Sequence, residues 1–177
     1  MKRIIAFLAL SMIASTSFAF TLISENPHKF ANQKVSINID SQSCEKIGLS
    51  SERLLNLAVE AVDRTWNTVK GIRIKFIKGV TTSDPHEEAV LISCFNTIAH
   101  EGLSEGGIEG KYHFVKILWG ASTATDEELM NSISHSFGHA LGLGHSNRID
   151  AHMSYSFSNP LLTDDDRDGY QYLYNFN

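Results

Sequence analysis

Apolar and polar residues alternate along several short segments of the chain, as they do in half-buried β-strands. Residues 35–39 and 72–77 show this alternation, residues 89–95 form an apolar run bounded by turn residues, and residues 112–119 have the same strand character. We predict a strand in each of these four segments. Residues 96–111 are rich in glycine and carry few large apolar side chains, so we expect an irregular surface loop there.

Apolar residues recur at helical spacing over residues 51–69, with Ser50 or Ser51 as the N-cap. A second helix is predicted over residues 126–141. A third helix begins at Thr163, with three acidic residues in its first turn, where we interpret them as an N-terminal cap, and aromatic residues later that can pack inward. The order of these elements is typical of an α+β domain in which helices pack against a mixed sheet.

The first 19 residues have the composition of a secretory signal peptide. Lys2 and Arg3 give a basic start, residues 4–13 are apolar, and Ser17 and Ala19 fit a small-x-small cleavage site. We therefore expect a signal peptide over residues 1–19 and one domain over residues 20–177, located in the periplasm or secreted.

Acidic residues outnumber basic ones. The 177 residues include 20 Asp and Glu against 15 Lys and Arg, a formal net charge of −5, which becomes −7 when Lys2 and Arg3 are removed with the signal peptide. An acidic surface repels phosphate backbones and anionic lipids, and no later segment approaches the roughly 20 apolar residues of a membrane-spanning helix. We expect a monomer with neither nucleic acid nor membrane as a partner.

The two cysteines leave two alternatives open. The spacing of Cys44 and Cys94 does not distinguish one disulfide between distant segments from two separate buried thiols. Neither residue lies near the histidine cluster described next, so we expect no cysteine ligand in a zinc site.

Three of the eight histidines lie close together in the sequence. His135 and His139 are four residues apart in a predicted helix, so their rings lie on one face and reach one zinc ion about 2 Å from each nitrogen. Gly142 can adopt the left-handed conformation that ends this helix, which lets His145 approach the same metal. Three neutral nitrogens with an open fourth position are typical of a catalytic zinc site, and we predict one Zn²⁺.

The segment HSFGHALGLGHS at residues 135–146 resembles the zinc signature H-E-x-x-H-x-x-G-x-x-H-S of the matrixin branch of the metzincin metallopeptidases. Residues 151–155, AHMSY, are similar to the Met-turn that lies beneath the zinc in that clan. Residues 162–174 resemble the matrixin closing helix, L-[ST]-x-D-D-x-x-G-x-x-x-L-Y. These motifs together cover residues 131–174.

The resemblance implies a fold, a ligand set and a reaction. The implied fold is α+β, a mixed twisted sheet packed on two helices with a C-terminal helix after the Met-turn. The three histidines are the implied zinc ligands, and Met153 is the apolar floor of the site. Tyr155 matches the tyrosine that ligates zinc or stabilises the oxyanion in some metzincins. The family hydrolyses peptides bound as an extended strand along a sheet edge, and residues 112–119 are our candidate for that edge.

Ser136 departs from the family pattern at the position of the catalytic glutamate. In the family mechanism that glutamate takes a proton from the attacking water and delivers it to the leaving amine. A serine hydroxyl is no base near neutral pH, and such a proton shuttle is typically worth about 10²- to 10⁴-fold in rate. We therefore expect weak hydrolysis, or a pseudoprotease that binds zinc and a peptide or protein partner without cleavage. A third alternative is a purely structural zinc.

Two further points concern acidic residues. Four acids lie in segments that can border the active-site cleft, and the sequence gives no reason to choose a substitute base among them. They are Glu101, Glu105, Glu109 and Asp150. Val115 follows His113 and Phe114, where animal matrixins have an acid that helps build accessory zinc and calcium sites. We therefore do not expect those accessory ions.

Overall fold

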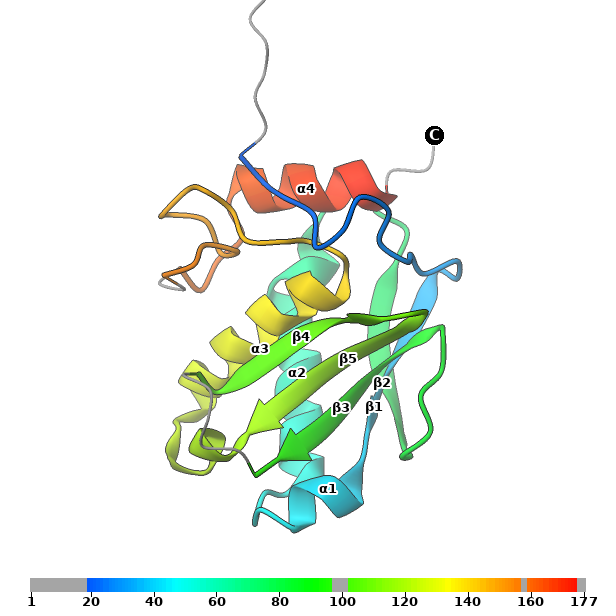
Figure 1. Cartoon of the computed structure of the whole chain (residues 1–177), viewed down its shortest axis with the longest axis vertical. Helices are drawn as coiled ribbons and strands as arrows, with labels where there is room; N and C mark the ends of the chain where they lie inside the picture. Colours follow the sequence, from blue (N-terminus) through cyan, green and yellow to red (C-terminus); the bar gives the residue numbers. More distant parts are fainter. Residues whose placement is uncertain (1–18, 97–101, 157–158, 175–177) are drawn as a thin grey trace, which may run out of the picture.

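A five-stranded mixed sheet lies at the centre of the computed structural model, which describes residues 19–96, 102–156 and 159–174 (Figure 1). The strand order is β2-β1-β3-β5-β4, and all neighbours are parallel except the antiparallel pair β4 and β5. The mixed sheet predicted from the sequence is thereby confirmed. The strands are β1 (Lys34–Ile39), β2 (Lys75–Thr81), β3 (Ala89–Phe95), β4 (Ser104–Glu109) and β5 (Tyr112–Leu118).

The prediction of an irregular loop over residues 96–111 is wrong, because β4 lies within it. Gly110 has φ 61°, a left-handed conformation that allows the tight turn from β4 into β5. A Cβ atom on Gly106 would lie 1.9 Å from the carbonyl oxygen of Ser136, so only glycine lets β4 approach the helix that carries Ser136. As a consequence β4 is the edge strand and β5 is internal, so residues 112–119 are not the sheet edge that we predicted.

Helices α2 and α3 cover one face of the sheet, and α4 lies at one end of it (Figure 1). Ser50 caps α2 by accepting from the backbone N–H of Arg53 at 3.3 Å. Thr125 and Glu128 form a capping box at the start of α3. The predicted first helix is shorter than expected, since α2 gives way to a 3₁₀ turn, and α1 was not predicted. The helices are α1 (Ser41–Glu45), α2 (Ser51–Arg64), η1 (Trp66–Thr68), η2 (Trp119–Thr123), α3 (Asp126–Ala140) and α4 (Asp164–Tyr174).

The hydrophobic core lies between the sheet and the helices. It includes alternate residues of β1 and β3, such as Ile37 and Ile92, and the inner faces of α2 and α3, such as Leu54 and Phe137. Tyr170, Leu173 and Tyr174 of α4 are also buried, as the sequence predicted. Burial of apolar surface at about 25 cal/mol per Å² is the main force that holds the metal-site helix against the sheet.

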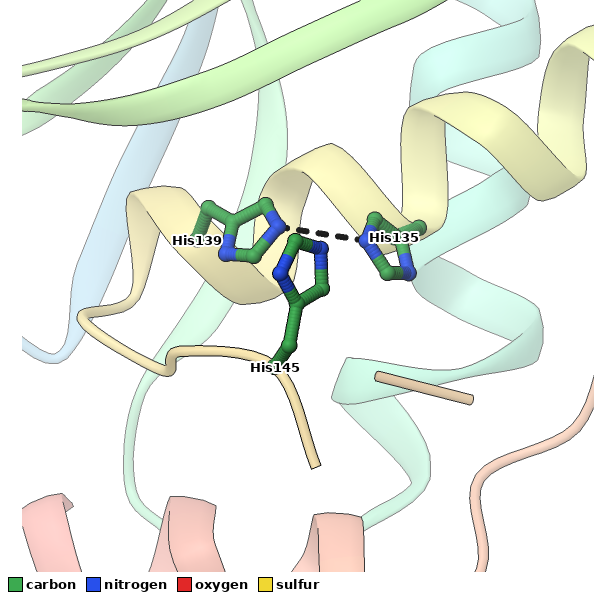
Figure 2. A group of neighbouring side chains, drawn as sticks. All are labelled: His135, His139 and His145. Atoms are coloured by element: carbon green, nitrogen blue, oxygen red, sulfur yellow. Dashed lines mark hydrogen bonds between the residues drawn. The ribbon is translucent and has the colours of Figure 1, made fainter. Parts of the chain in front are cut away.

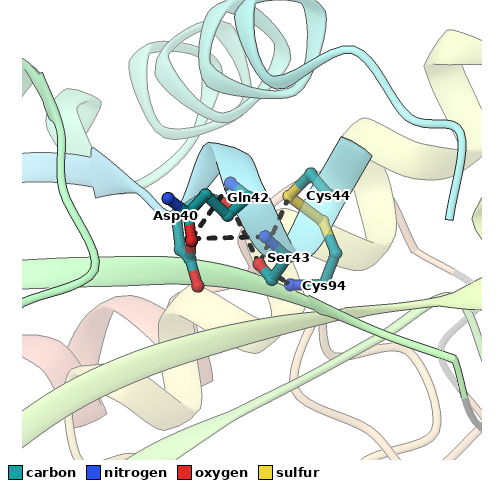
Figure 3. Close-up of a disulfide and its surroundings, with 5 residues drawn as sticks. All are labelled: Asp40, Gln42, Ser43, Cys44 and Cys94. Carbon is teal, nitrogen blue, oxygen red and sulfur yellow. Dashed lines mark hydrogen bonds between the residues drawn. A yellow bond between two sulfur atoms is a disulfide. The ribbon is translucent and has the colours of Figure 1, made fainter. Parts of the chain in front are cut away.

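A disulfide joins Cys44 in α1 to Cys94 near the end of β3 (Figure 3). The surrounding backbone is fixed by hydrogen bonds: Asp40 accepts from the backbone of Ser43 at 3.3 Å, and the Ser43 hydroxyl accepts from the backbone N–H of Cys94 at 2.9 Å. Of the two alternatives that the sequence left open, the structure contains the bridge. It links segments 50 residues apart.

The ends of the chain are only partly described. The expected signal peptide lies almost entirely outside the described residues, which begin at residue 19. Within the described part, no helix has both the length and the apolar character that crossing a membrane requires.

Candidate metal centre

Three histidine rings converge beside α3 (Figure 2). His135 and His139 project from one face of the helix, and His145 approaches from the segment that follows it. One nitrogen from each ring lies within 4.8 Å of the other two. The Nε2 atoms of His135 and His139 are 3.1 Å apart.

The turn after α3 brings His145 to the other two rings. Gly142 has φ 103°, and the backbone N–H of Leu143 donates to the carbonyl oxygen of Gly138 at 3.0 Å, which closes the helix end. The N-terminal segment covers this turn, because the Thr21 hydroxyl donates to the carbonyl oxygen of His145 at 2.7 Å. Gly142 thus has the left-handed conformation that we expected at the end of this helix.

Hydrogen bonds to carbonyl groups orient the two helical histidines. Nδ1 of His135 lies 2.8 Å from the carbonyl oxygen of His152, and Nδ1 of His139 lies 2.8 Å from that of Leu143. A carbonyl oxygen only accepts, so each Nδ1 carries the proton and each Nε2 keeps its lone pair. Two lone pairs therefore face each other across the 3.1 Å between these Nε2 atoms, and no proton is left to bridge them.

Burial keeps the cluster neutral. It lowers the pKa of His135 to about 3 and that of His139 to about 4, and it also lowers the pKa of His145. Three converging neutral nitrogens suit a cation, and tetrahedral zinc with Zn–N bonds of about 2 Å requires nitrogens about 3.3 Å apart. The donor set therefore fits zinc.

Met153 lies directly beneath α3, where it is 2% exposed. A Cβ atom on Gly138 would lie 2.2 Å from Met153 Sδ, so the helix can approach the methionine only with glycine at this position. Asp166 holds the backbone here, because its carboxylate accepts from the N–H groups of His152 and Met153, each at 2.9 Å. The same carboxylate accepts from the backbone of Thr163 at 2.7 Å.

Asp166 is therefore both the cap of α4 and the anchor of the turn that carries Met153. The cap was predicted from the acidic run, but the anchor was not. Nothing local in the sequence distinguishes Asp166 from Asp164, which lies at the surface. Only the spacing of the closing-helix motif indicates the position.

Ser136 is buried beneath the β4 edge, with 1% exposure. Its hydroxyl lies 2.8 Å from that of Ser104 in β4, which lies 2.8 Å from that of Ser132 one turn earlier in α3. The sequence did not indicate this chain of three hydroxyls, because Ser104 lies on a strand that was predicted as loop. The Ser136 hydroxyl thus contacts another hydroxyl group, whereas a general base at this position would be a carboxylate.

Of the candidate substitute bases, Glu105 lines the same cleft as the histidines and Ser136, and its carboxylate pairs with Lys116 at 3.1 Å. Asp150 pairs with Arg148 at 2.7 Å. Glu109 lies at the far end of β4, opposite Tyr112. Glu101 lies outside the described residues.

A cleft of about 890 Å³ opens between β4 and α3. All three histidines and Ser136 line it. Tyr155 lies beside it with its ring centroid 4.1 Å from that of His145, and its side chain is 78% exposed. The histidine nitrogens are therefore accessible to a molecule in the cleft.

His113 is a buried packing residue on β5. Its Nδ1 donates to the carbonyl oxygen of Ala140 at 2.7 Å, and its Nε2 lies 3.1 Å from Nδ1 of His28. Its ring stacks on Phe30 at a centroid distance of 3.8 Å, and burial lowers its pKa to about 4. His28 has no sequence pattern that would have indicated this pairing.

Similarity to known proteins agrees with this geometry. The matrixin family model (Peptidase M10) matches residues 23–175. The chain is 37% identical to interstitial collagenase from Bos taurus over 106 residues, 58% of this chain and 22% of that protein. It is 32% identical to matrix metalloproteinase-18 from Xenopus laevis over 116 residues, 63% of this chain and 24% of that protein.

A third relative is stromelysin-3 from Mus musculus, which is 38% identical over 81 residues, 44% of this chain and 16% of that protein. The chain thus spans less than a quarter of the length of these relatives. The family match itself covers the sheet, the three histidines, the Met153 turn and α4. The chain belongs to the matrixin family of zinc metallopeptidases.

Proposed function

We propose that this protein is a metallopeptidase-like domain that binds one Zn²⁺ through His135, His139 and His145 and accepts a peptide or protein in the adjoining cleft. The observation that carries the proposal is the convergence of three neutral ring nitrogens, two of which are fixed by carbonyl groups with their lone pairs inward. Such an arrangement is unfavourable without a cation and is the usual form of a catalytic zinc site.

A zinc ion in such a site supplies Lewis acidity, which polarises a peptide carbonyl group and lowers the pKa of water. The chain supplies the binding surface, because β4 is the edge strand of the sheet in the described residues and a sheet edge can add an extended peptide as a further strand. Tyr155 lies against His145 and is our candidate for stabilising the oxyanion. Met153 packs against Gly138 of the helix that carries His135 and His139.

Ser136 limits the reaction in this proposal. Its hydroxyl can orient water or a carbonyl group by hydrogen bonding, but it does not accept a proton near neutral pH. We therefore propose that hydrolysis is weak. The second candidate is a pseudoprotease that binds a peptide or partner without cleaving it. It is supported by the same residue, since the Ser136 hydroxyl lies 2.8 Å from another serine hydroxyl, that of Ser104.

Metal analysis tests the zinc site. The purified domain is expected to bind one zinc per chain, and His139→Ala is expected to lose it, since two ligands hold zinc far more weakly than three. His86→Ala is the matched control, because His86 is an exposed loop residue and should leave the zinc content unchanged. A parent protein that binds no zinc at neutral pH would overturn the proposal.

We also propose that residues 1–19 are a signal peptide and that the mature domain is secreted or periplasmic and monomeric. The disulfide supports an oxidising compartment, because such bonds are rare where thiols are kept reduced. Mass spectrometry of the exported protein is expected to show a chain that starts near Phe20 with Cys44 and Cys94 oxidised. A protein retained inside the cell with its first 19 residues intact would contradict this.

A further inference from the structure

The cleft beside the histidines continues along α3 toward the start of the helix. Glu128, Ser132 and Ser136 follow one another at helical spacing on one face, and all three line the cleft. Glu128 is seven residues before His135, a distance of about 10 Å along the helix axis. The cleft therefore has an arm that extends about two helical turns beyond the metal centre.

Small polar residues line part of this arm, and the apolar residues Leu103, Ala124 and Pro160 also line the cleft. Ser104, Ser132 and Ser136 form a chain of hydroxyls with two contacts of 2.8 Å. These contacts use two of the three hydroxyl protons, so most of the groups that remain are oxygen lone pairs. Gly120 and Thr123 also line the cleft. Ser132 and Ser136 are buried, so Ser104 is the member of this chain of hydroxyls that is partly exposed.

The far end of the arm is negative. The Glu128 carboxylate accepts from the backbone N–H and the hydroxyl of Thr125 at 2.9 and 2.8 Å, and these bonds lower its pKa. The neighbouring acids Asp126 and Glu127 pair with arginines of α2, whereas Glu128 has no basic partner among the described residues. The described residues that line the cleft include no lysine or arginine.

We propose that this arm selects peptides that place an arginine or lysine side chain in it, with the cation beside Glu128. An acidic side chain would be repelled by Glu128, and an apolar one would gain no charge interaction there. This inference rests on the proposed function, because it needs a peptide bound in the cleft.

Peptide binding to the zinc-loaded protein tests the inference. Blocked alanine-rich peptides carry one variable residue, which is arginine, citrulline, leucine or glutamate, and calorimetry gives each affinity. Citrulline has nearly the shape of arginine without its charge. Since Glu128 is exposed, we expect arginine to bind about threefold more tightly than citrulline at low salt, with a smaller ratio at high salt. For any peptide that is cleaved, kcat/KM replaces affinity.

Two variants locate the effect. Glu128→Gln keeps a side chain that can cap α3 and is expected to bring the arginine-to-citrulline ratio close to one. Glu127→Gln removes the same charge from the next residue, which does not line the cleft, and should preserve the ratio. Equal binding of arginine and citrulline peptides by the parent, or a ratio that Glu128→Gln leaves unchanged, overturns this inference alone. If no peptide binds, the proposed peptide-binding function fails with it.

Discussion

At the scale of single residues, Gly138 controls how closely α3 approaches the turn beneath the metal centre. A Cβ atom there would lie 2.2 Å from Met153 Sδ and 2.9 Å from Trp66 Cζ2. In an exposed helix, replacing glycine with alanine stabilises by about 1 kcal/mol. At position 138 we expect the same replacement to destabilise the protein, because the buried Met153 has to move to make room for the new methyl group.

We predict that Gly138→Ala lowers the free energy of unfolding by about 1–3 kcal/mol and weakens zinc binding. Chemical denaturation and metal titration measure the two effects. In the double variant Gly138→Ala/Met153→Ala the loss should be smaller than the sum of the two single losses, since Met153→Ala removes atoms that the new methyl group meets. A Gly138→Ala protein that is more stable than the parent would show that this close approach is unimportant.

At the scale of elements, the sequence predicted the helices better than the sheet edge. Helix α3 follows from its capping residues and from the histidine spacing, both of which are local signals. Strand β4 carries Gly106 and Gly107 where strands usually carry side chains, so its pattern favours a loop. It forms because β5 pairs with it and α3 packs against it, and both contacts are invisible in a local pattern.

The residues of the candidate metal site also divide into those with a local sequence signal and those that depend on long-range contacts. The three histidines were predicted because helix geometry and a single glycine turn bring them together. Asp166 and Ser104 were not predicted in their roles, because each acts on a partner far away in the sequence: Asp166 on the backbone of Met153, and Ser104 on the hydroxyl of Ser136. Long-range contacts of this kind depend on tertiary packing.

At the scale of the whole molecule, the fold presents the metal centre at the wall of an open cleft between the sheet edge and α3. The turn after α3, the Met153 turn and the cap of α4 together hold the histidines, and the disulfide fixes the opposite end of the sheet (Figures 1 and 3). This scaffold is that of the matrixin family. We propose that Ser136 occupies the position of the family's proton-transfer group.

The most direct test of this account is the rate of peptide hydrolysis by zinc-loaded Ser136→Glu, beside the parent and Ser136→Gln at equal zinc content. Glutamate restores a base beside the metal centre, whereas glutamine has the same size and no basic carboxylate. We predict that Ser136→Glu raises kcat/KM over both by about 10²- to 10⁴-fold. A Ser136→Glu protein no faster than Ser136→Gln would contradict the account, because the missing base would then not be what limits this domain.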